Sequence, residues 1–193
     1  MNSSERRKEK LGDICINITD GKHGDCKNEA NSGFYCVSVK DIYDGKINYE
    51  NARQITEDDF QETHKRTRLG KDDILVTNSG TIGRMALVKD DDRTDKTTFQ
   101  KSVAIIKPDK NIINPLYLYY FIKSDIKRLS EFAGGTTQKN LLLKDLRNFK
   151  IIIPSFIEQK SIANTLSCLD EKIEINNRIN NNLEEIARAI FKS

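Results

Sequence analysis

The sequence predicts an α+β fold, in which a strand-rich domain with a curled or barrel-like sheet and flanking helices precedes one long C-terminal helix. Short apolar runs separated by turn signals occupy residues 11–154, and closely spaced strands of this kind are typical of curled antiparallel sheets. From Ile157 the apolar spacing changes to the helical period and keeps it to the end. The 193 residues suffice for a real core, because a unit of this size buries roughly 70% of its unfolded surface.

The elements of the first domain follow from local signals. Asp44-Gly45 is a hairpin signal, and the polar stretch 56–65 has a helical pattern. The predicted strands are residues 11–18, 34–39, 46–49, 74–77, 85–88 and 101–108. Asn114 and Pro115 predict a helix start, because Asn caps helices and Pro suits the first turn. That helix runs to about Phe132, and a short helix at 142–146 and a strand at 151–153, closed by Pro154, complete the domain.

The C-terminal helix carries apolar or small residues in alternating steps of four and three, which is the spacing of a coiled-coil seam. The predicted seam and dimerisation residues are Ile162, Leu166, Leu169, Ile173, Asn176, Asn180, Leu183, Ala187 and Ile190. The two asparagines form polar layers, which specify register and partner and lower stability. The alternative is an amphipathic helix folded back on its own domain. A helix of about 35 residues spans roughly 50 Å, more than one small domain covers, so we expect a partner.

Composition excludes several classes of protein. No apolar run approaches the roughly 20 residues of a membrane span, and the charged N-terminus lacks a signal-peptide core, so we expect a soluble, cytoplasmic protein. The net charge is +3, and it is unevenly distributed: residues 123–150 hold seven basic and three acidic side chains. Basic clusters are typical of phosphate contacts. Four cysteines at wide spacing and two histidines form no metal-ligand pattern, and we expect reduced, mostly buried thiols.

No motif indicates catalysis or a cofactor. Asn114-Pro115-Leu116-Tyr117 resembles the Asn-Pro-Pro-Tyr string of amino-methyltransferases, but the second proline and a nucleotide-binding turn are missing. Gly80-Thr81-Ile82-Gly83 and Gly134-Gly135 lack the Gly-Lys-Ser/Thr ending of a P-loop. Adjacent acidic pairs such as Asp72-Asp73 lie in turn-rich stretches, where solvated carboxylates are the ordinary interpretation. We therefore expect no catalytic residue, no metal and no cofactor.

Three polar loops remain, at residues 19–25, 77–84 and 134–140. They are rich in Thr, Asn, Gln, Lys, Gly and Ser. Asn, Gln, Arg and Lys side chains make bidentate contacts to base edges, and Gly, Ser and Thr let the backbone approach phosphates. Three such loops beside a basic cluster favour sequence-reading DNA binding over the other functions.

The chain resembles the specificity subunits of type I restriction-modification systems. The strings that carry the resemblance are Leu11-Gly12-Asp13-Ile14, Asp20-Gly21-Lys22-His23, Leu69-Gly70-Lys71-Asp72-Asp73-Ile74-Leu75, Ser79-Gly80-Thr81-Ile82-Gly83, Gln100-Lys101, Thr136-Thr137-Gln138-Lys139-Asn140-Leu141, Ile153-Pro154, Glu158-Gln159-Lys160-Ser161-Ile162-Ala163 and Leu169-Asp170-Glu171-Lys172-Ile173. Their order and spacing together are more specific than any one string.

The resemblance implies a DNA-binding target recognition domain at residues 1–154 and a conserved spacer helix at 155–193, for dimerisation and docking of methyltransferase subunits. Such subunits are not enzymes. They read bipartite double-stranded DNA and hold methyltransferase (M) subunits, joined by restriction and motor (R) subunits. Family members usually carry two recognition domains and two antiparallel helices, whereas this chain has one of each and resembles half a subunit. We therefore expect an antiparallel homodimer that reads inverted half-sites, its domains about one to one and a half DNA turns apart.

The residues predicted to contact bases or phosphates are Lys22, His23, Asn78, Thr81, Arg84, Thr137, Gln138, Lys139 and Asn140. Two other interpretations stay open. One is a stand-alone DNA methyltransferase or nuclease, and the other is a coiled-coil assembly module that binds no DNA.

Overall fold

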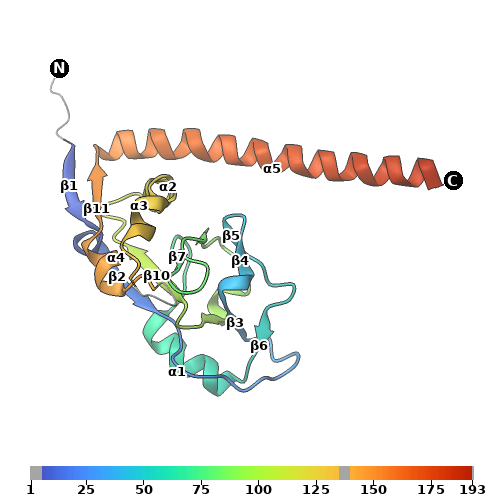
Figure 1. The fold of residues 1–193 in the computed structure, drawn as a ribbon, viewed down its shortest axis with the longest axis horizontal. Helices are drawn as coiled ribbons and strands as arrows, with labels where there is room; N and C mark the ends of the chain where they lie inside the picture. Colours follow the sequence, from blue (N-terminus) through green and yellow to red (C-terminus); the bar gives the residue numbers. More distant parts are fainter. Residues whose placement is uncertain (1–5, 135–139, 193) are drawn as a thin grey trace.

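The structure is a computed structural model that describes residues 6–134 and 140–192, and Figure 1 shows a mixed domain with one long helix running over and beyond it. The strands are β1 (Arg7–Lys10), β2 (Cys15–Asp20), β3 (Tyr35–Val37), β4 (Ile42–Tyr43), β5 (Lys46–Ile47), β6 (Arg53–Gln54), β7 (Ile74–Thr77), β8 (Met85–Leu87), β9 (Thr97–Phe99), β10 (Val103–Pro108) and β11 (Lys150–Ile153). The α-helices are α1 (Glu57–Thr67), α2 (Pro115–Ser124), α3 (Ile126–Glu131), α4 (Leu143–Asn148) and α5 (Phe156–Lys192), and the 3-10 helices are η1 (Leu11–Asp13), η2 (Val39–Asp41) and η3 (Thr94–Lys96). The α+β class and the long C-terminal helix are therefore confirmed.

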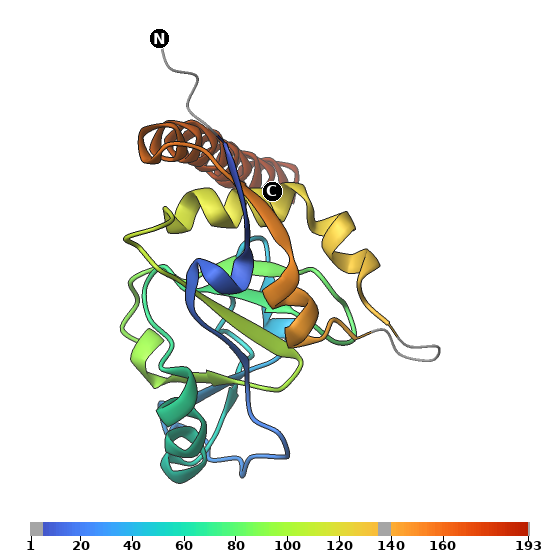
Figure 2. The ribbon, with the colours of Figure 1, turned by 90° about the vertical axis from the view of Figure 1, so that its left-hand side faces the viewer.

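A four-stranded sheet in the order β2-β10-β7-β8 forms the centre of the domain, and its neighbouring strands are antiparallel. Along β7, Ile74 and Val76 belong to one apolar cluster and Leu75 to another, so the sheet is buried on both faces. The first cluster includes side chains of α2 and α4, and the second includes Val37 of β3 and Phe99 of β9. Unbroken apolar runs suit such doubly covered strands. In Figure 2, α2 lies directly beneath α5.

A three-stranded sheet in the order β6-β3-β9 packs beside the centre, and its β3–β9 pair is parallel. Helix α1 packs against β9, and Phe60 of α1 stacks on Phe34 with 4.8 Å between ring centroids. Cys26 and Cys36 are buried in the same small cluster. Burial raises the pKa of Cys36 to about 12, which keeps its thiol protonated. The thiols of Cys26 and Cys36 are buried as expected, but Cys15 is only partly buried and Cys168 is exposed, so the expectation of mostly buried thiols holds for half of the four.

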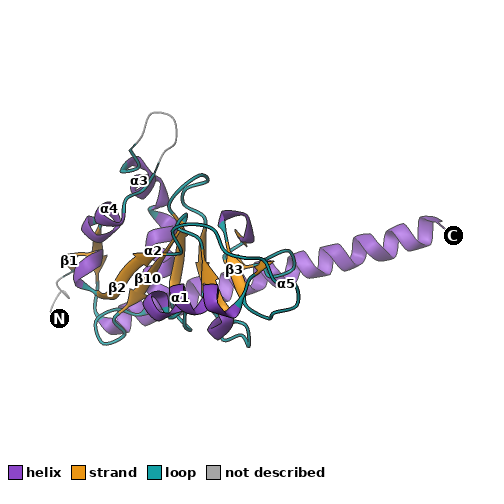
Figure 3. Cartoon of the chain, turned by 90° about the horizontal axis from the view of Figure 1, so that it is seen from below, coloured by secondary structure: helices purple, strands orange, loops and turns teal. Residues whose placement is uncertain are grey.

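The β4–β5 hairpin turns at Asp44 and Gly45, as their signal predicts. Both have positive φ, 52° and 74°, as a tight two-residue hairpin turn requires. A side chain at Gly45 would put its Cβ 2.8 Å from the hydroxyl of Tyr119, so the hairpin lies against α2. Figure 3 shows the same domain from below, with α5 projecting past it.

A single helix was expected from Asn114 to about Phe132, but the structure has two helices there, α2 and α3. Its start is confirmed, because Asn114 Oδ1 accepts a hydrogen bond from the backbone N–H of Tyr117 at 3.0 Å. The break lies at Asp125, whose φ of −111° and ψ of 18° end α2. The Asp125 carboxylate then accepts a hydrogen bond from Arg128 Nε at 2.7 Å in the first turn of α3. This pairing across the break stabilises the new helix start.

Within the described residues the strands form four separate sheets, and none closes into a barrel. A closed barrel is therefore not formed by these strands, and the curled form of the sheet stays a prediction. One of these sheets pairs β1 with β11, Arg7 lying opposite Ile153, and so joins the first described strand to the strand that leads into α5. Across the described part of the chain, no helix is long and apolar enough to cross a membrane.

Candidate nucleic-acid interface

The first polar loop, residues 19–25, is fastened to α1 by Lys22. This side chain is only 8% exposed, and its Nζ forms ion pairs with Asp59 and, at 2.8 Å, with Glu62. These hydrogen bonds raise the pKa of Lys22 and, on the other side, lower the pKa of Asp59 to about 2. The sequence predicted Lys22 as a DNA contact, but its ammonium lies between two carboxylates of α1.

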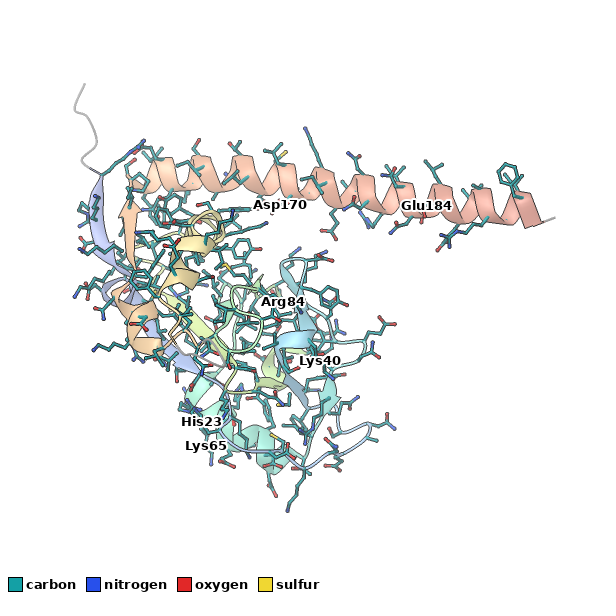
Figure 4. All side chains as sticks on the ribbon, viewed as in Figure 1. His23, Lys40, Lys65, Arg84, Asp170 and Glu184 are labelled. Atoms are coloured by element: carbon teal, nitrogen blue, oxygen red, sulfur yellow. The ribbon has the colours of Figure 1, made fainter. Side chains whose placement is uncertain are left out.

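His23 occupies the exposed part of the same loop. Its Nε2 lies 3.1 Å from Asp20 Oδ2, and 66% of its side chain is exposed. The loop backbone is held by Arg66 of α1, which donates to Thr19 Oγ1 at 2.9 Å and to the carbonyl of Gly21 at 2.8 Å. His23 is therefore presented to solvent by a loop that α1 fixes from behind. Figure 4 shows it at the α1 end of the domain.

The second loop, residues 77–84, is a compact turn closed on itself. The carbonyl of Thr77 accepts from the N–H of Gly83 at 3.0 Å, and Gly83 has a φ of 92°. Thr81 and Arg84 are exposed. Arg84 donates from Nη1 to the carbonyl of Val39 at 3.2 Å, which leaves the rest of its guanidinium at the surface.

Asn78 joins the second loop to the third. Its carbonyl accepts from Leu141 N at 2.8 Å, and the next residue, Ser79, forms an antiparallel bridge to the exposed Asn140. Asn78 itself is buried, and its side-chain Oδ1 has no hydrogen-bond partner among the described residues. Thr137, Gln138 and Lys139, which the sequence also predicted, lie outside the described residues.

The segment 100–102 connects the first loop to the second. Lys101 N donates to the carbonyl of Lys22 at 3.0 Å, and Ser102 accepts from Asn78 N at 2.9 Å. The backbone thus links the first loop to the second through residues 100–102, and the second loop to the described ends of the third through Asn78 and Ser79. The exposed Lys101 was missed as a site residue, although its position at the start of a predicted strand, between polar loops, was a usable signal.

Helix α5 holds its predicted seam largely in solvent. The seam residues Ile162, Leu169, Ile173, Leu183 and Ile190 are 40%, 51%, 57%, 57% and 65% exposed, Leu166 is half-buried, and Asn176, Asn180 and Ala187 are exposed. A second apolar set, Ile175, Ile179 and Ile186, is 46%, 49% and 56% exposed. Cys168 is an exposed thiol on the same helix. The alternative, an amphipathic helix folded back on its own domain, describes the part of α5 up to Glu174, which contacts the domain, and not the exposed remainder.

The described residues contain no group of three or more His, Cys, Asp or Glu side chains placed to hold a metal ion. What the geometry offers is a set of exposed polar and cationic groups on loops that are braced by the sheet and α1. Such groups bind polar surfaces through hydrogen bonds and charge.

The molecule is therefore an α+β domain that links three polar loops by backbone hydrogen bonds and continues into a protruding helix. The model of the type I restriction modification DNA specificity domain matches residues 4–185, and the chain belongs to this family.

Two specificity subunits and one solved structure illustrate the relationship. The chain is 33% identical over 171 residues to the EcoBI specificity subunit of Escherichia coli, covering 83% of this chain and 35% of that one. It is 27% identical over 181 residues to the MjaVIII specificity subunit of Methanocaldococcus jannaschii, covering 91% and 42%. The crystal structure of a type I restriction-modification S subunit from M. genitalium shares the fold, with a TM-score of 0.64 at 21% identity over 90% of this chain and 41% of that one. The chain thus spans well under half the length of these relatives.

Proposed function

We propose that this chain is a non-catalytic DNA specificity subunit in which residues 1–154 form a target recognition domain that reads one half-site of a bipartite duplex. The observation that carries the proposal is the backbone linkage of the three polar loops on a domain of the specificity family: the first and second through residues 100–102, and the second and third through Asn78 and Ser79. Loops linked to one another by backbone hydrogen bonds present their side chains in a fixed arrangement, as base recognition requires.

Within this site, His23, Lys101 and Arg84 are exposed and free to approach DNA from three different segments. Thr81 and Asn140 add short polar groups beside them, and Thr137, Gln138 and Lys139 remain predicted contacts on the third loop. Lys22 acts instead as a positioning residue, because its charge is already neutralised by Asp59 and Glu62.

We further propose that α5 is a spacer helix that pairs with a second copy in antiparallel fashion. Residues 163, 170 and 174 face the domain, and the seam residues 162, 169 and 173 each precede one of them by one position. One position is about 100° around a helix, so the partner helix lies beside α5 and not beneath it. Two-fold pairing along that side leaves both recognition domains on one side of the helix pair, where a single duplex can contact both.

In this proposal the helix pair also holds methyltransferase and restriction subunits, in the cytoplasm, and the chain performs no chemistry itself. The rival functions are a stand-alone DNA methyltransferase or nuclease and an assembly module that binds no DNA. A methyl-transfer assay without added catalytic subunit tests the enzyme, and a gel shift on random duplex at low salt tests the module.

The deciding experiment selects bound duplexes from a random pool, with the methyltransferase subunit present. We expect two inverted copies of one short sequence at a fixed spacing, and a dimer by light scattering at micromolar concentration. A selected target without inverted symmetry, or a monomer, contradicts the antiparallel homodimer. A pool that shows no enrichment contradicts DNA reading itself.

A further inference from the structure

Helix α5 is fastened to the domain at two places along its length. The first place is its N-terminal turn and the turn after it, where Gln159 and Ala163 are each 1% exposed. Gln159 Oε1 accepts from Asn114 N at 2.8 Å, and its Nε2 donates to the carbonyl of Pro154 at 3.1 Å. This buried amide fixes where the helix starts.

The second place lies further along the helix and is made of polar side chains. Asp170 Oδ2 accepts from the hydroxyl of Tyr120 at 3.0 Å and from Lys123 Nζ at 3.3 Å, both on α2. One turn later, Glu174 forms an ion pair with Lys46 of β5. We call Lys46, Tyr120, Lys123, Asp170 and Glu174 the helix latch. Figure 4 labels Asp170 above the domain and Glu184 on the part of α5 beyond it.

The domain side of the latch is itself well supported. Tyr119 and Tyr120 pack edge to face at 5.3 Å between ring centroids, and Lys123 Nζ lies 5.5 Å and 5.7 Å from the two ring centroids. Tyr119 is buried against Gly45 of the hairpin that carries Lys46. Burial and the bond to Asp170 raise the pKa of Tyr120, so its hydroxyl stays a donor. Helix α2, which carries Tyr120 and Lys123, and the hairpin that carries Lys46 therefore pack against each other.

Because the latch lies in the first half of α5, it controls how far the C-terminal end of the helix moves when the helix tilts. From Glu174 to Lys192 the helix runs about 27 Å beyond the latch, and its whole length is about 55 Å. A tilt of about 5° about the first turn moves the far end by about 5 Å. That displacement exceeds the roughly 3.4 Å rise of one base pair. A small change in the angle of α5 therefore moves a partner domain by more than one base step.

We propose that the helix latch sets the angle between α5 and the recognition domain, and so selects the spacing between the two half-sites. The latch residues are positioning residues: they touch no DNA and leave the half-site sequence to the loops. The proposal rests on the proposed function, because spacing has meaning only for a dimer that reads two half-sites.

The test compares wild-type chain with Asp170→Asn, Tyr120→Phe and Lys123→Met on duplexes carrying the selected half-sites at every spacing from zero to about twelve base pairs, roughly one DNA turn. Each variant should keep the half-site sequence and the melting temperature. Its preference for the best spacing over spacings one base pair longer or shorter should fall about threefold, the factor expected when a partly exposed polar contact is lost. Glu171→Gln is the matched control, because this neighbouring carboxylate accepts a hydrogen bond from Ser167 of its own helix. It should keep the wild-type spacing preference.

A second readout needs no DNA. Spin labels at Lys40→Cys and Glu185→Cys, in a Cys168→Ser chain diluted with unlabelled protein, report the distance from the domain to the far half of α5. Asp170→Asn should broaden that distance distribution, and Glu171→Gln should not. Unchanged spacing preference together with an unchanged distribution overturns the latch. A changed half-site sequence overturns it as well, because the residue would then belong to the reading surface. If wild-type chain reads no sequence, the proposed function fails, and the distance measurement alone decides the latch.

Discussion

Lys22, on the loop after β2, forms a nearly solvent-free ion pair with Asp59 of α1, the two side chains being 8% and 17% exposed. Asp59 also accepts from the backbone N–H of Lys27 at 2.7 Å, so one carboxylate holds two points of the chain that follows β2. The loop that presents His23 is therefore positioned by a charge pair beneath it. Lys22, a basic residue in a polar loop, therefore stabilises the fold through this ion pair.

Replacing Lys22 with Met should destabilise the fold and not merely weaken binding. Removal of the ammonium leaves the partly buried Asp59 without its charge partner, and we expect a loss of about 2–3 kcal/mol in the free energy of unfolding. Urea titration measures it. Lys65→Met, at an exposed position on the same helix, is the control and should change stability by less than about 0.5 kcal/mol. Equal stability of both variants contradicts the structural role.

The same pair should make stability depend on acid. Hydrogen bonds from Lys22 and from Lys27 N lower the pKa of Asp59 from 3.8 to about 2. Because the folded value lies below the unfolded one, the contribution is complete above about pH 4 and is lost as the pH falls towards about 2. The difference in unfolding free energy between wild type and Asp59→Asn, measured by urea titration at several pH values, should therefore shrink over that window. A difference that is constant from pH 5 to pH 2 would refute the assignment.

Arg84 should contribute directly to DNA binding. If it contacts a phosphate, Arg84→Ala weakens all duplexes alike and lowers the salt slope by about one unit. If it reads a base, the loss is about 1 to 3 kcal/mol at one position of the target. Fluorescence anisotropy at several salt concentrations separates the two. Lys65→Ala on α1 should change neither quantity. If Arg84→Ala and Gln138→Ala both leave affinity and salt dependence unchanged, the loops are not the reading surface.

Ile173→Asp should convert the proposed dimer to a monomer, because it puts a charge into the helix seam. Ile175→Asp is a closely matched control: the two residues are 57% and 46% exposed and lie about 200° apart around α5. Light scattering, with circular dichroism to check helix content, should show a monomer for the first variant and a dimer for the second. The reverse result would move the interface to the stripe of Ile175, Ile179 and Ile186.

Gly21→Ala should destabilise the domain severely. A Cβ at this position would overlap the carbonyl of Phe99, which is backbone and cannot rotate away. We expect a loss of at least about 3 kcal/mol in unfolding free energy, by thermal or urea denaturation. Gly134→Ala, where a Cβ meets no atom of the described residues within 4 Å, should be nearly neutral. A tolerated Gly21→Ala would mean that the first loop lies further from β9 than the structure has it.

Elements signalled by a few neighbouring residues could be predicted, and elements held by distant partners could not. Asn114 capping and the Asp44-Gly45 turn depend on local chemistry, and both are present. Strand β1 was not predicted, because Arg7–Lys10 is entirely charged and becomes a strand only by pairing with β11 at the other end of the domain. The parallel β3–β9 pair was missed for the same reason.

In the candidate site, too, local features could be predicted, and contacts between distant segments could not. Composition alone indicated which loops are polar, and hence His23, Thr81 and Arg84 as exposed groups. That the first and second loops are linked through residues 100–102, and the second to the third through Asn78 and Ser79, depends on backbone hydrogen bonds between segments far apart in sequence. The pairing of Lys22 with Asp59, across 37 positions, was equally invisible without coordinates.

The exposed thiol of Cys168 can show whether two α5 helices pair parallel or antiparallel. If two helices run antiparallel about the asparagine layers, centred near residue 178, the two copies of Cys168 lie about 30 Å apart along the axis. In a parallel pair they would be about 10 Å apart or less, the separation of packed helix axes. A short thiol cross-linker should therefore join parallel helices and leave antiparallel ones as single chains on a denaturing gel, and the native sequence already carries the cysteine that this experiment needs.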